Sequence, residues 1–241
     1  MSPCPVCSRV HRCRGVTDAP GYFITGTDTG VGKTVITLGL MQWLQDRGHR
    51  VVGMKSVASG CERTDQGLRN EDALLLQQQA SMTLPYEQVN PYTFEPAIAP
   101  HLAAAAAGVR IEIDTLEAGC RTLQAGADSI CVEGVGGWLV PLNERETVAD
   151  LAVRLGLGVV LVVGIRMGCL NHALLTARAI ESTGLTLAGW VANRLPPPAD
   201  FAQQNIAALE ARLAAPLLGI VPPLVEIDAR RVAACLSQAV V

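Results

Sequence analysis

The chain has 241 residues, of which 49% are hydrophobic and 17% are charged, and its formal net charge is −3. This charge excludes the basic surface that nucleic-acid binding needs. No apolar run approaches the roughly 18 residues that cross a bilayer, and the N-terminus has no apolar signal core. The sequence therefore predicts a cytoplasmic protein with a sizeable core and no nucleic-acid or membrane partner.

Residues 1–20 are predicted to form a disordered tail outside a single domain that covers residues 21–241. Cys4, Cys7, His11 and Cys13 have a spacing that zinc ligands can have. A closed zinc site needs ligands presented by folded structure, and this stretch has few apolar residues to build it. We therefore favour a disordered tail, or translated sequence upstream of the true start, over a zinc site. The cysteines beyond residue 20 are scattered singly, which is typical of reduced thiols.

Residues 22–34 combine an apolar strand, a glycine-rich turn and the start of a helix. The run 22–25 predicts the strand, and the helix is expected from residue 33 to about residue 47. Five residues separate Gly26 from Gly32, where the usual phosphate loop has four. The flanking strand and helix are the context that this motif requires, so we favour a phosphate cradle over a plain glycine turn with a capping threonine.

Such a cradle binds the phosphates of a nucleotide. Its backbone N–H groups and the positive end of the helix dipole point at one spot. Lys33 is expected to reach the terminal phosphates, and the Thr34 hydroxyl is expected to bind magnesium. The sequence therefore predicts ATP and Mg²⁺ as ligands.

A second lysine is expected at the same edge of the sheet. Residues 51–55 predict a strand that ends at Lys55, and a tight loop of small residues is expected over 56–60. Ligands of open α/β sheets bind at the C-terminal ends of the strands. We favour a second cation that faces the phosphates over a solvated lysine at a strand end.

The next segments are predicted as a polar loop over 61–72, a helix over 73–80 and a proline-rich loop over 90–101. Asp72 has two interpretations that the sequence leaves open: a cap for the helix, or a carboxylate turned towards the metal. A long loop that holds three prolines often lines a binding site. His101 is interpreted as structural, because it begins an alanine-rich helix.

The stretch 128–137 carries the second acidic candidate. An apolar strand ends at Glu133 and is followed by glycines. A carboxylate at a strand end opposite the phosphate cradle is suited to magnesium. We favour this role over an ordinary charge at a strand end.

The remaining strands are predicted over 158–164, 187–193 and 217–221. A helix that starts at Gly168 and runs to about residue 183 offers free N–H groups, which could hold a substrate carboxylate or be plainly capped. Asn193 has a donor and an acceptor, which suits an adenine edge. Because strands and helices alternate throughout, we predict one doubly wound, mainly parallel α/β domain.

These residues together resemble the dethiobiotin synthetase family, a branch of the P-loop NTPase fold, from residue 22 to about residue 224. The matching pieces are residues 25–29 with 31–34, Lys55 with 57–60, 68–70 with Asp72, 90–94, 132–134 with 136–138, 168–169 with 171–172, and 189–193. The five-residue gap in the loop is itself the family's form. The resemblance implies a magnesium-dependent ligase of biotin biosynthesis that uses ATP and carbon dioxide to close a cyclic urea on 7,8-diaminononanoate.

The resemblance also implies the chemical roles of individual residues. Lys33 and Lys55 stabilise the concentrated negative charge of the reaction, and Lys55, Ser59 and Thr29 face the carbamate. The implied metal ligands are Thr34, Asp72 and Glu133. The implied nucleotide contacts are Gly30, Val31, Gly32, Lys33, Thr34, Val35, Asp72, Glu133, Gly134, Gly136, Asn193, Pro222, Pro223 and Leu224. The backbone implied to meet the substrate carboxylate, near the interface of a homodimer, is that of Gly168, Cys169, Leu170 and Asn171.

Two departures and two rival functions accompany the resemblance. Residues 1–20 are not part of the family pattern, and Ser56 stands where a proline is usual. A regulatory ATPase of the partitioning and metal-delivery class would place a second lysine early in the loop, where this chain has Asp28. An amide-forming ligase of cofactor assembly is weakened by the lack of a glutaminase segment. Beyond residue 225 little matches the family.

Overall fold

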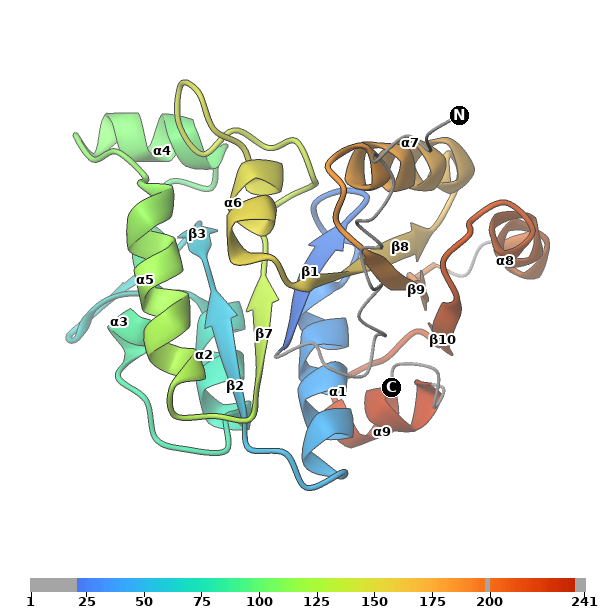
Figure 1. Cartoon of the computed structure of the whole chain (residues 1–241), viewed down its shortest axis with the longest axis horizontal. Coiled ribbons are helices and arrows are strands. Elements are labelled where there is room, and N and C mark those ends of the chain that lie inside the picture. Colours follow the sequence, from blue (N-terminus) through green and yellow to red (C-terminus); the bar gives the residue numbers. More distant parts are fainter. Residues whose placement is uncertain (1–20, 198–199, 237–241) are drawn as a thin grey trace, which may run out of the picture.

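Six parallel strands form the central sheet in the part of the chain that the computed structural model describes, which is residues 21–197 and 200–236 (Figure 1). The predictions for residues 1–20 lie outside these ranges. The order across the sheet is β10-β9-β8-β1-β7-β2. The strands are β1 (Gly21–Gly26), β2 (Val51–Lys55), β7 (Ser129–Glu133), β8 (Gly158–Ile165), β9 (Leu187–Arg194) and β10 (Leu217–Val221).

The order of the strands places the end of β1 at a topological switch point. The chain runs from β1 to the edge strand β2, returns through β7, and then crosses to β8 on the other side of β1. The loops that follow the neighbouring strands β1 and β8 run in opposite directions across the sheet. Such a divergence opens a crevice at the C-terminal ends of the two strands. This confirms the predicted doubly wound parallel sheet, with β7 inserted between the two strands of the first βαβ unit.

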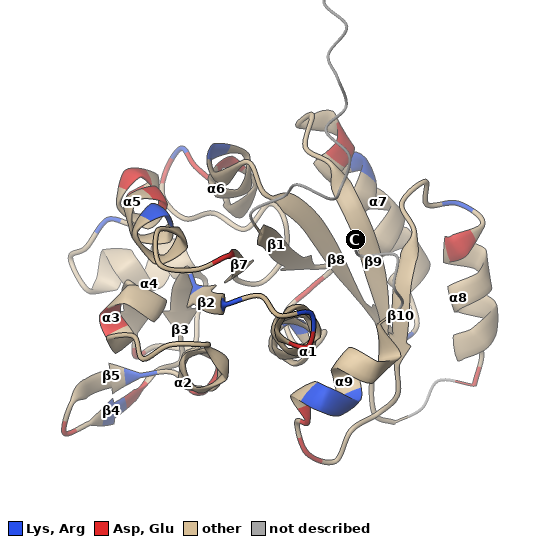
Figure 2. Ribbon diagram, turned by 60° about the horizontal axis from the view of Figure 1, so that its bottom comes forward, with Lys and Arg blue, Asp and Glu red and all other residues tan. Residues whose placement is uncertain are grey.

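Helices cover both faces of the sheet (Figure 2). One face carries α1 (Lys33–Gln45), α2 (Glu71–Gln79) and α9 (Ala229–Cys235). The other face carries α5 (Ile113–Gln124), α6 (Val148–Leu155), α7 (Cys169–Ser182) and α8 (Ala202–Glu210). Two short helices, α3 (Tyr86–Val89) and α4 (Pro100–Ala106), precede α5. In the described ranges no helix combines the length and the apolarity that crossing a bilayer requires.

The central strands are continuous apolar runs in the sequence because both of their faces are buried. Residues 159–165 of β8 are all buried, as expected for a strand with a helical layer on each face. Phe23 and Ile24 of β1 are fully buried beside them. Because β1 lies between two buried strands, the glycine-rich loop that follows it begins at a rigid part of the sheet.

Three predicted irregular segments contain short strands. The predicted small-residue loop includes β3 (Val57–Ser59), which pairs with β6 (Tyr92–Phe94) in the proline-rich segment. The predicted polar loop contains a hairpin of β4 (Glu62–Thr64) and β5 (Gly67–Arg69). The loop predictions were wrong here because strands of three residues, largely exposed in the hairpin, carry too few apolar positions to show a period.

In the segment that follows residue 225, which has little resemblance to the family, residues 229–235 form α9 on the face of α1. The Asp228 side chain caps α9 by accepting a hydrogen bond from the backbone N–H of Arg231 (3.1 Å). Gly39 of α1 lies under Val232 of α9, and a Cβ atom at Gly39 would lie 2.2 Å from Val232 Cγ1. The missing side chain of Gly39 therefore allows the two helices to pack closely.

Candidate active site

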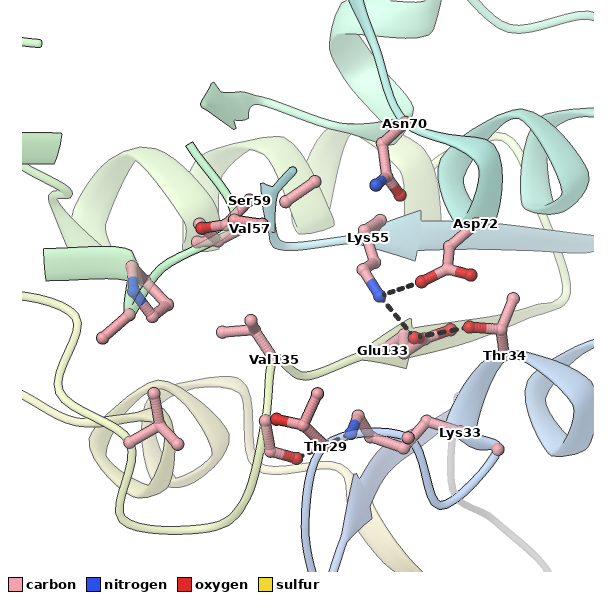
Figure 3. A pocket seen from close by; sticks show the side chains of 18 of the residues that line it. Thr29, Lys33, Thr34, Lys55, Val57, Ser59, Asn70, Asp72, Glu133 and Val135 are labelled. Atoms are coloured by element: carbon pink, nitrogen blue, oxygen red, sulfur yellow. Dashed lines mark hydrogen bonds and ion pairs between the residues drawn. The ribbon is translucent and has the colours of Figure 1, made fainter. Parts of the chain in front are cut away.

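A cavity of about 680 Å³ opens at the C-terminal ends of β1, β2 and β7 (Figure 3). Its walls come from the loop after β1, from the end of β2 and from the end of β7, three segments far apart in the sequence. Of the residues predicted to act in the site, it is lined by Thr29, Gly30, Gly32, Lys33, Thr34, Val35, Lys55, Ser59, Asp72, Glu133 and Gly136. The structure thus brings both predicted lysines to one cavity.

Lys33 is held by backbone carbonyl groups at the rim of the phosphate loop. Its Nζ donates to the carbonyl oxygens of Asp28 (3.0 Å) and Gly136 (2.7 Å). Burial, opposed by the charge of Glu133 and reinforced by that of Lys55, lowers the pKa of Lys33 to about 8. Gly32, with φ of 88°, makes the left-handed turn into α1 that directs the first amides of the helix at the same space.

Lys55 lies between two carboxylates. Its Nζ donates to Glu133 Oε1 (2.6 Å) and to Asp72 Oδ2 (2.8 Å), and the side chains of Lys55 and Glu133 are 7% and 0% exposed (Figure 3). Burial alone would lower the pKa of Lys55, but the charges of Glu133 and Asp72 outweigh it and the pKa is raised. The lysine is therefore a fixed positive charge that faces the phosphate loop.

Asp72 acts as a partner of this lysine and not as a helix cap. The Asn70 side chain caps α2 by accepting from the backbone N–H of Ala73 (3.3 Å). The capping interpretation of Asp72 was therefore wrong, and its alternative, a carboxylate turned towards a metal, stays a prediction. Burial would raise the pKa of Asp72, but Lys55 and the Thr34 hydroxyl lower it, so the carboxylate stays ionised.

The oxygen atoms around Glu133 fit a magnesium ion. The Thr34 hydroxyl donates to Glu133 Oε1 (3.0 Å), whereas Glu133 Oε2 is buried without a hydrogen-bond partner. Within the described residues no group of three His, Cys, Asp or Glu side chains could hold a metal. Mg²⁺ prefers few carboxylates together with water and substrate phosphates, which two carboxylates and one hydroxyl beside a phosphate loop can supply.

A smaller cavity of about 160 Å³ continues from the first, and both are lined by Gly32, Val35 and Ile227. The predicted adenine contacts Asn193, Pro222 and Leu224 line it. Asn193 Nδ2 donates to the carbonyl of Val31 (2.8 Å), which fixes the amide and leaves its oxygen free to accept. The two cavities together have room for a triphosphate and its base.

Comparison with known proteins decides the family. A family model described as an AAA domain matches residues 20–231. The ATP-dependent dethiobiotin synthetase BioD of Pseudomonas aeruginosa strain PAO1 is 54% identical over 219 residues, which cover 90% of this chain and 96% of that protein. BioD 1 of Escherichia coli strain K12 is 49% identical over 205 residues, covering 85% and 91%. The chain belongs to the dethiobiotin synthetase family.

Solved structures support the fold alone. The MinD cell division protein of Aquifex aeolicus has a TM-score of 0.54 at 16% identity, covering 89% of this chain and 87% of that one. The cell division ATPase MinD of Pyrococcus furiosus has a TM-score of 0.52 at 19% identity, covering 84% and 83%. The chain therefore combines a P-loop fold with the sequence of a dethiobiotin synthetase.

Some predicted site residues of this family member line neither cavity. Val31 is buried and contributes its carbonyl to Asn193, and Gly134 packs against Phe23 and Val148. Pro223 lies between two lining residues without lining the cavity itself. The predicted carboxylate contacts Gly168, Cys169, Leu170 and Asn171 lie at the start of α7, outside both cavities of this chain.

Sequence reasoning missed an apolar wall of the larger cavity. This wall consists of Val57, Ala58, Ala97, Ile98, Ala99, Pro100, Val135, Val140 and Ile227. The proline-rich segment 90–101 was predicted to line a site, and its residues 97–100 confirm this. Ile227 gave no signal, because it lies in the part of the chain where the family pattern ends. His101 is absent from both linings, in agreement with its structural interpretation.

Proposed function

We propose that this chain is an ATP-dependent dethiobiotin synthetase, which closes the cyclic urea of dethiobiotin from 7,8-diaminononanoate and carbon dioxide. The observation that carries the proposal is the single cavity that holds Lys33, Lys55 and the Glu133–Asp72 carboxylates beside an apolar wall. Ammonium groups suit anionic intermediates, and an apolar wall suits a hydrocarbon chain. The dethiobiotin synthetases at about 50% identity support the same activity.

The reaction passes through three anionic stages. One amine of the substrate attacks carbon dioxide and loses a proton to solvent, which gives a carbamate. A carbamate oxygen then attacks the γ-phosphorus of ATP, so that ADP leaves and a carbamic-phosphoric anhydride forms. The second amine attacks the anhydride carbon, phosphate leaves, and the cyclic urea is complete once this nitrogen has lost its proton. Each stage concentrates negative charge where the two lysines converge.

The residues of the chain have separate roles in this sequence. Lys55 faces the carbamate from the end of β2, and Ser59 offers it a buried hydroxyl that has no hydrogen-bond partner in the structure. Thr29 lies on the opposite wall, in the phosphate loop. Lys33 stabilises the negative charge that develops on the bridging and terminal phosphate oxygens. All four groups hold and orient the reactants, and none has to move a proton.

Magnesium is proposed to bind to Thr34, Asp72 and Glu133. The unpartnered Oε2 of buried Glu133 supports this assignment. When bound, the ion would neutralise phosphate charge and polarise the transferred phosphoryl group. Asn193 and residues 222–224 are proposed to frame the adenine in the smaller cavity.

A homodimer is proposed to complete the substrate site. The amides at the start of α7 are suited to a carboxylate but lie outside the cavity of their own chain, so a second subunit would have to present them. We place the enzyme in the cytoplasm, where its ATP is available. The cysteines of the described ranges are all unpaired, which fits a reducing compartment.

The proposal is tested by ATP turnover with and without the diamine and bicarbonate. We expect ADP release to depend on the diamine and to match the dethiobiotin formed. Strong ATP hydrolysis without the diamine would favour a regulatory ATPase instead. No sequence feature supports that rival, since the similarity to MinD extends to the fold alone.

A further inference from the structure

The phosphate loop carries an acidic side chain that the proposed reaction does not use. Asp28 lies five residues before Lys33, in a loop that has to hold a triphosphate. A carboxylate in this loop repels the negatively charged triphosphate unless a nearby positive charge compensates it. The side chain is 46% exposed, so it is not shielded by burial.

Arg166 supplies that charge from another part of the chain. Its Nη2 donates to Asp28 Oδ2 (2.5 Å), across 138 residues of sequence. Arg166 follows β8 and precedes Gly168, the left-handed residue at the start of α7, and its own carbonyl accepts from the N–H of Cys169 (3.1 Å). The arginine is thus fixed by the turn into α7 while its guanidinium reaches the phosphate loop.

Asp28 in turn contacts the loop at two further points. Its Oδ1 accepts from the backbone N–H of Thr29 (2.7 Å), and its carbonyl accepts from Lys33 Nζ (3.0 Å). Both Thr29 and Lys33 line the larger cavity. A displacement of Asp28 would therefore disturb two residues of the proposed site at once.

We propose that Arg166 is a positioning residue that cancels the charge of Asp28 and fixes the phosphate loop for ATP. This inference rests on the proposed function, because it presupposes a triphosphate in the loop. Arg166 acts through Asp28, since Arg166 itself lines neither cavity. The ion pair also joins the loop before α1 to the loop before α7. The ATP phosphates are assigned to the start of α1, and the substrate carboxylate is assigned to the start of α7.

The test measures ATP binding by calorimetry with Mg²⁺ present, on the full chain and at low ionic strength. Arg166→Gln should weaken ATP binding about fivefold, the upper range for an exposed pair, and the loss should shrink with added salt. The KM for ATP should rise by a similar factor, while kcat at saturating ATP stays unchanged. Arg166→Lys should restore most of the affinity, because it restores the charge.

Two controls separate charge compensation from a structural effect. Arg178→Gln removes an exposed arginine of α7, 3.9 Å from Glu181, and should leave ATP binding unchanged. Asp28→Asn keeps the acceptor for Thr29 but removes the charge, so Asp28→Asn/Arg166→Gln should bind ATP within about twofold of the wild type. Melting temperatures of all variants would confirm that each is folded.

Two results would overturn the inference. Either Arg166→Gln binds ATP as the Arg178→Gln control does, or the double variant stays as weak as Arg166→Gln. A wild-type chain that does not bind ATP would instead refute the proposed function. The two failures are therefore distinguishable in one set of titrations.

Discussion

At the scale of single residues, the site depends on a lysine held between two carboxylates. Replacing Lys55 by Met keeps the length of the stem and removes the ammonium group. Dethiobiotin formation should fall by about a thousandfold or more, since the charge on the carbamate loses its partner. Unfolding in urea should show a loss of about 3 kcal/mol, because Glu133 is left buried and unpaired.

The double variant Lys55→Met/Glu133→Gln separates these two effects. It removes the unpaired charge, so stability should largely return while activity stays lost. A Lys55→Met enzyme that works at nearly the wild-type rate would show that the assigned role of Lys55 is wrong.

Glu133 gives the residue-scale test of magnesium binding. Its buried Oε2, which has no hydrogen-bond partner, is the observation that most directly supports metal binding. Glu133→Gln should raise the Mg²⁺ concentration for half-maximal activity by about tenfold or more, because an amide oxygen is a weaker ligand than a carboxylate. An unchanged magnesium titration would count against metal ligation by this residue.

Lys33 gives a prediction on pH. In the ligand-free chain its pKa is about 8, so the side chain is charged at pH 7 and largely neutral at pH 9. Bound phosphates favour the charged form, so above pH 8 each binding event must take up a proton. ATP affinity should therefore fall as the pH rises from 7 to 9, by up to about tenfold per pH unit above 8.

Calorimetry in buffers of different ionisation enthalpy would detect this proton uptake. Lys33→Arg, whose guanidinium stays charged, should show a flat profile over the same range, although its overall affinity is lower. A wild-type profile as flat as that of Lys33→Arg would contradict a lowered pKa in Lys33.

At the scale of elements, the packing of α9 on α1 depends on Gly39. Alanine usually stabilises a helix interior by up to about 1 kcal/mol over glycine. Here the added Cβ would lie 2.2 Å from Val232 Cγ1, so Gly39→Ala should destabilise the protein by about 1–2 kcal/mol in spite of this propensity. Chemical denaturation of the two proteins would measure the difference.

Gly119 of α5 is the matched control. A Cβ atom there would meet Met54 Cε at 3.6 Å and Pro91 Cγ at 3.9 Å, which are ordinary contacts. Gly119→Ala should therefore be neutral or stabilising by up to about 1 kcal/mol. If both variants change stability alike, close packing of α9 is not what Gly39 provides.

At the scale of the whole molecule, the sheet was predictable because its strands are long and apolar. Residues 158–164 and 187–193 carry enough apolar positions to be identified alone, and alternation with helices implies parallel strands. Lys33 and Lys55 could be placed in one site because both follow strands that end at the same edge. The order of the sheet was not predictable, since nothing local to β7 specifies that it lies between β1 and β2.

Side-chain pairing was the part that the sequence could not resolve. Asn70 and Asp72 are both good helix caps by type and both line the larger cavity, and only the three-dimensional structure shows that Asn70 caps α2 while Asp72 pairs with Lys55. The ion pair of Asp28 with Arg166 joins two loops by a contact that no local pattern marks. Ile227 lines the cavity because α9 packs on α1, a tertiary contact without a sequence motif.

The location of the α7 start, outside its own cavity, leads to a prediction for the assembly. Asn171→Asp places a negative charge where the substrate carboxylate is assigned, while an acid in the first turn is compatible with the helix dipole. The variant should fold normally, and its KM for the diamine should rise by about tenfold or more. Lys55→Met should be inactive alone.

Mixing these two variants tests whether each site is shared between subunits. In a mixed dimer one site carries both defects and the other carries neither, so an equal mixture that exchanges freely should recover about a quarter of the wild-type activity. The mixture is measured at a diamine concentration well below the KM of Asn171→Asp, with each variant alone as the baseline. If one subunit builds its whole site, the mixture will do no more than average the two variants, and the α7 amides would then serve no partner.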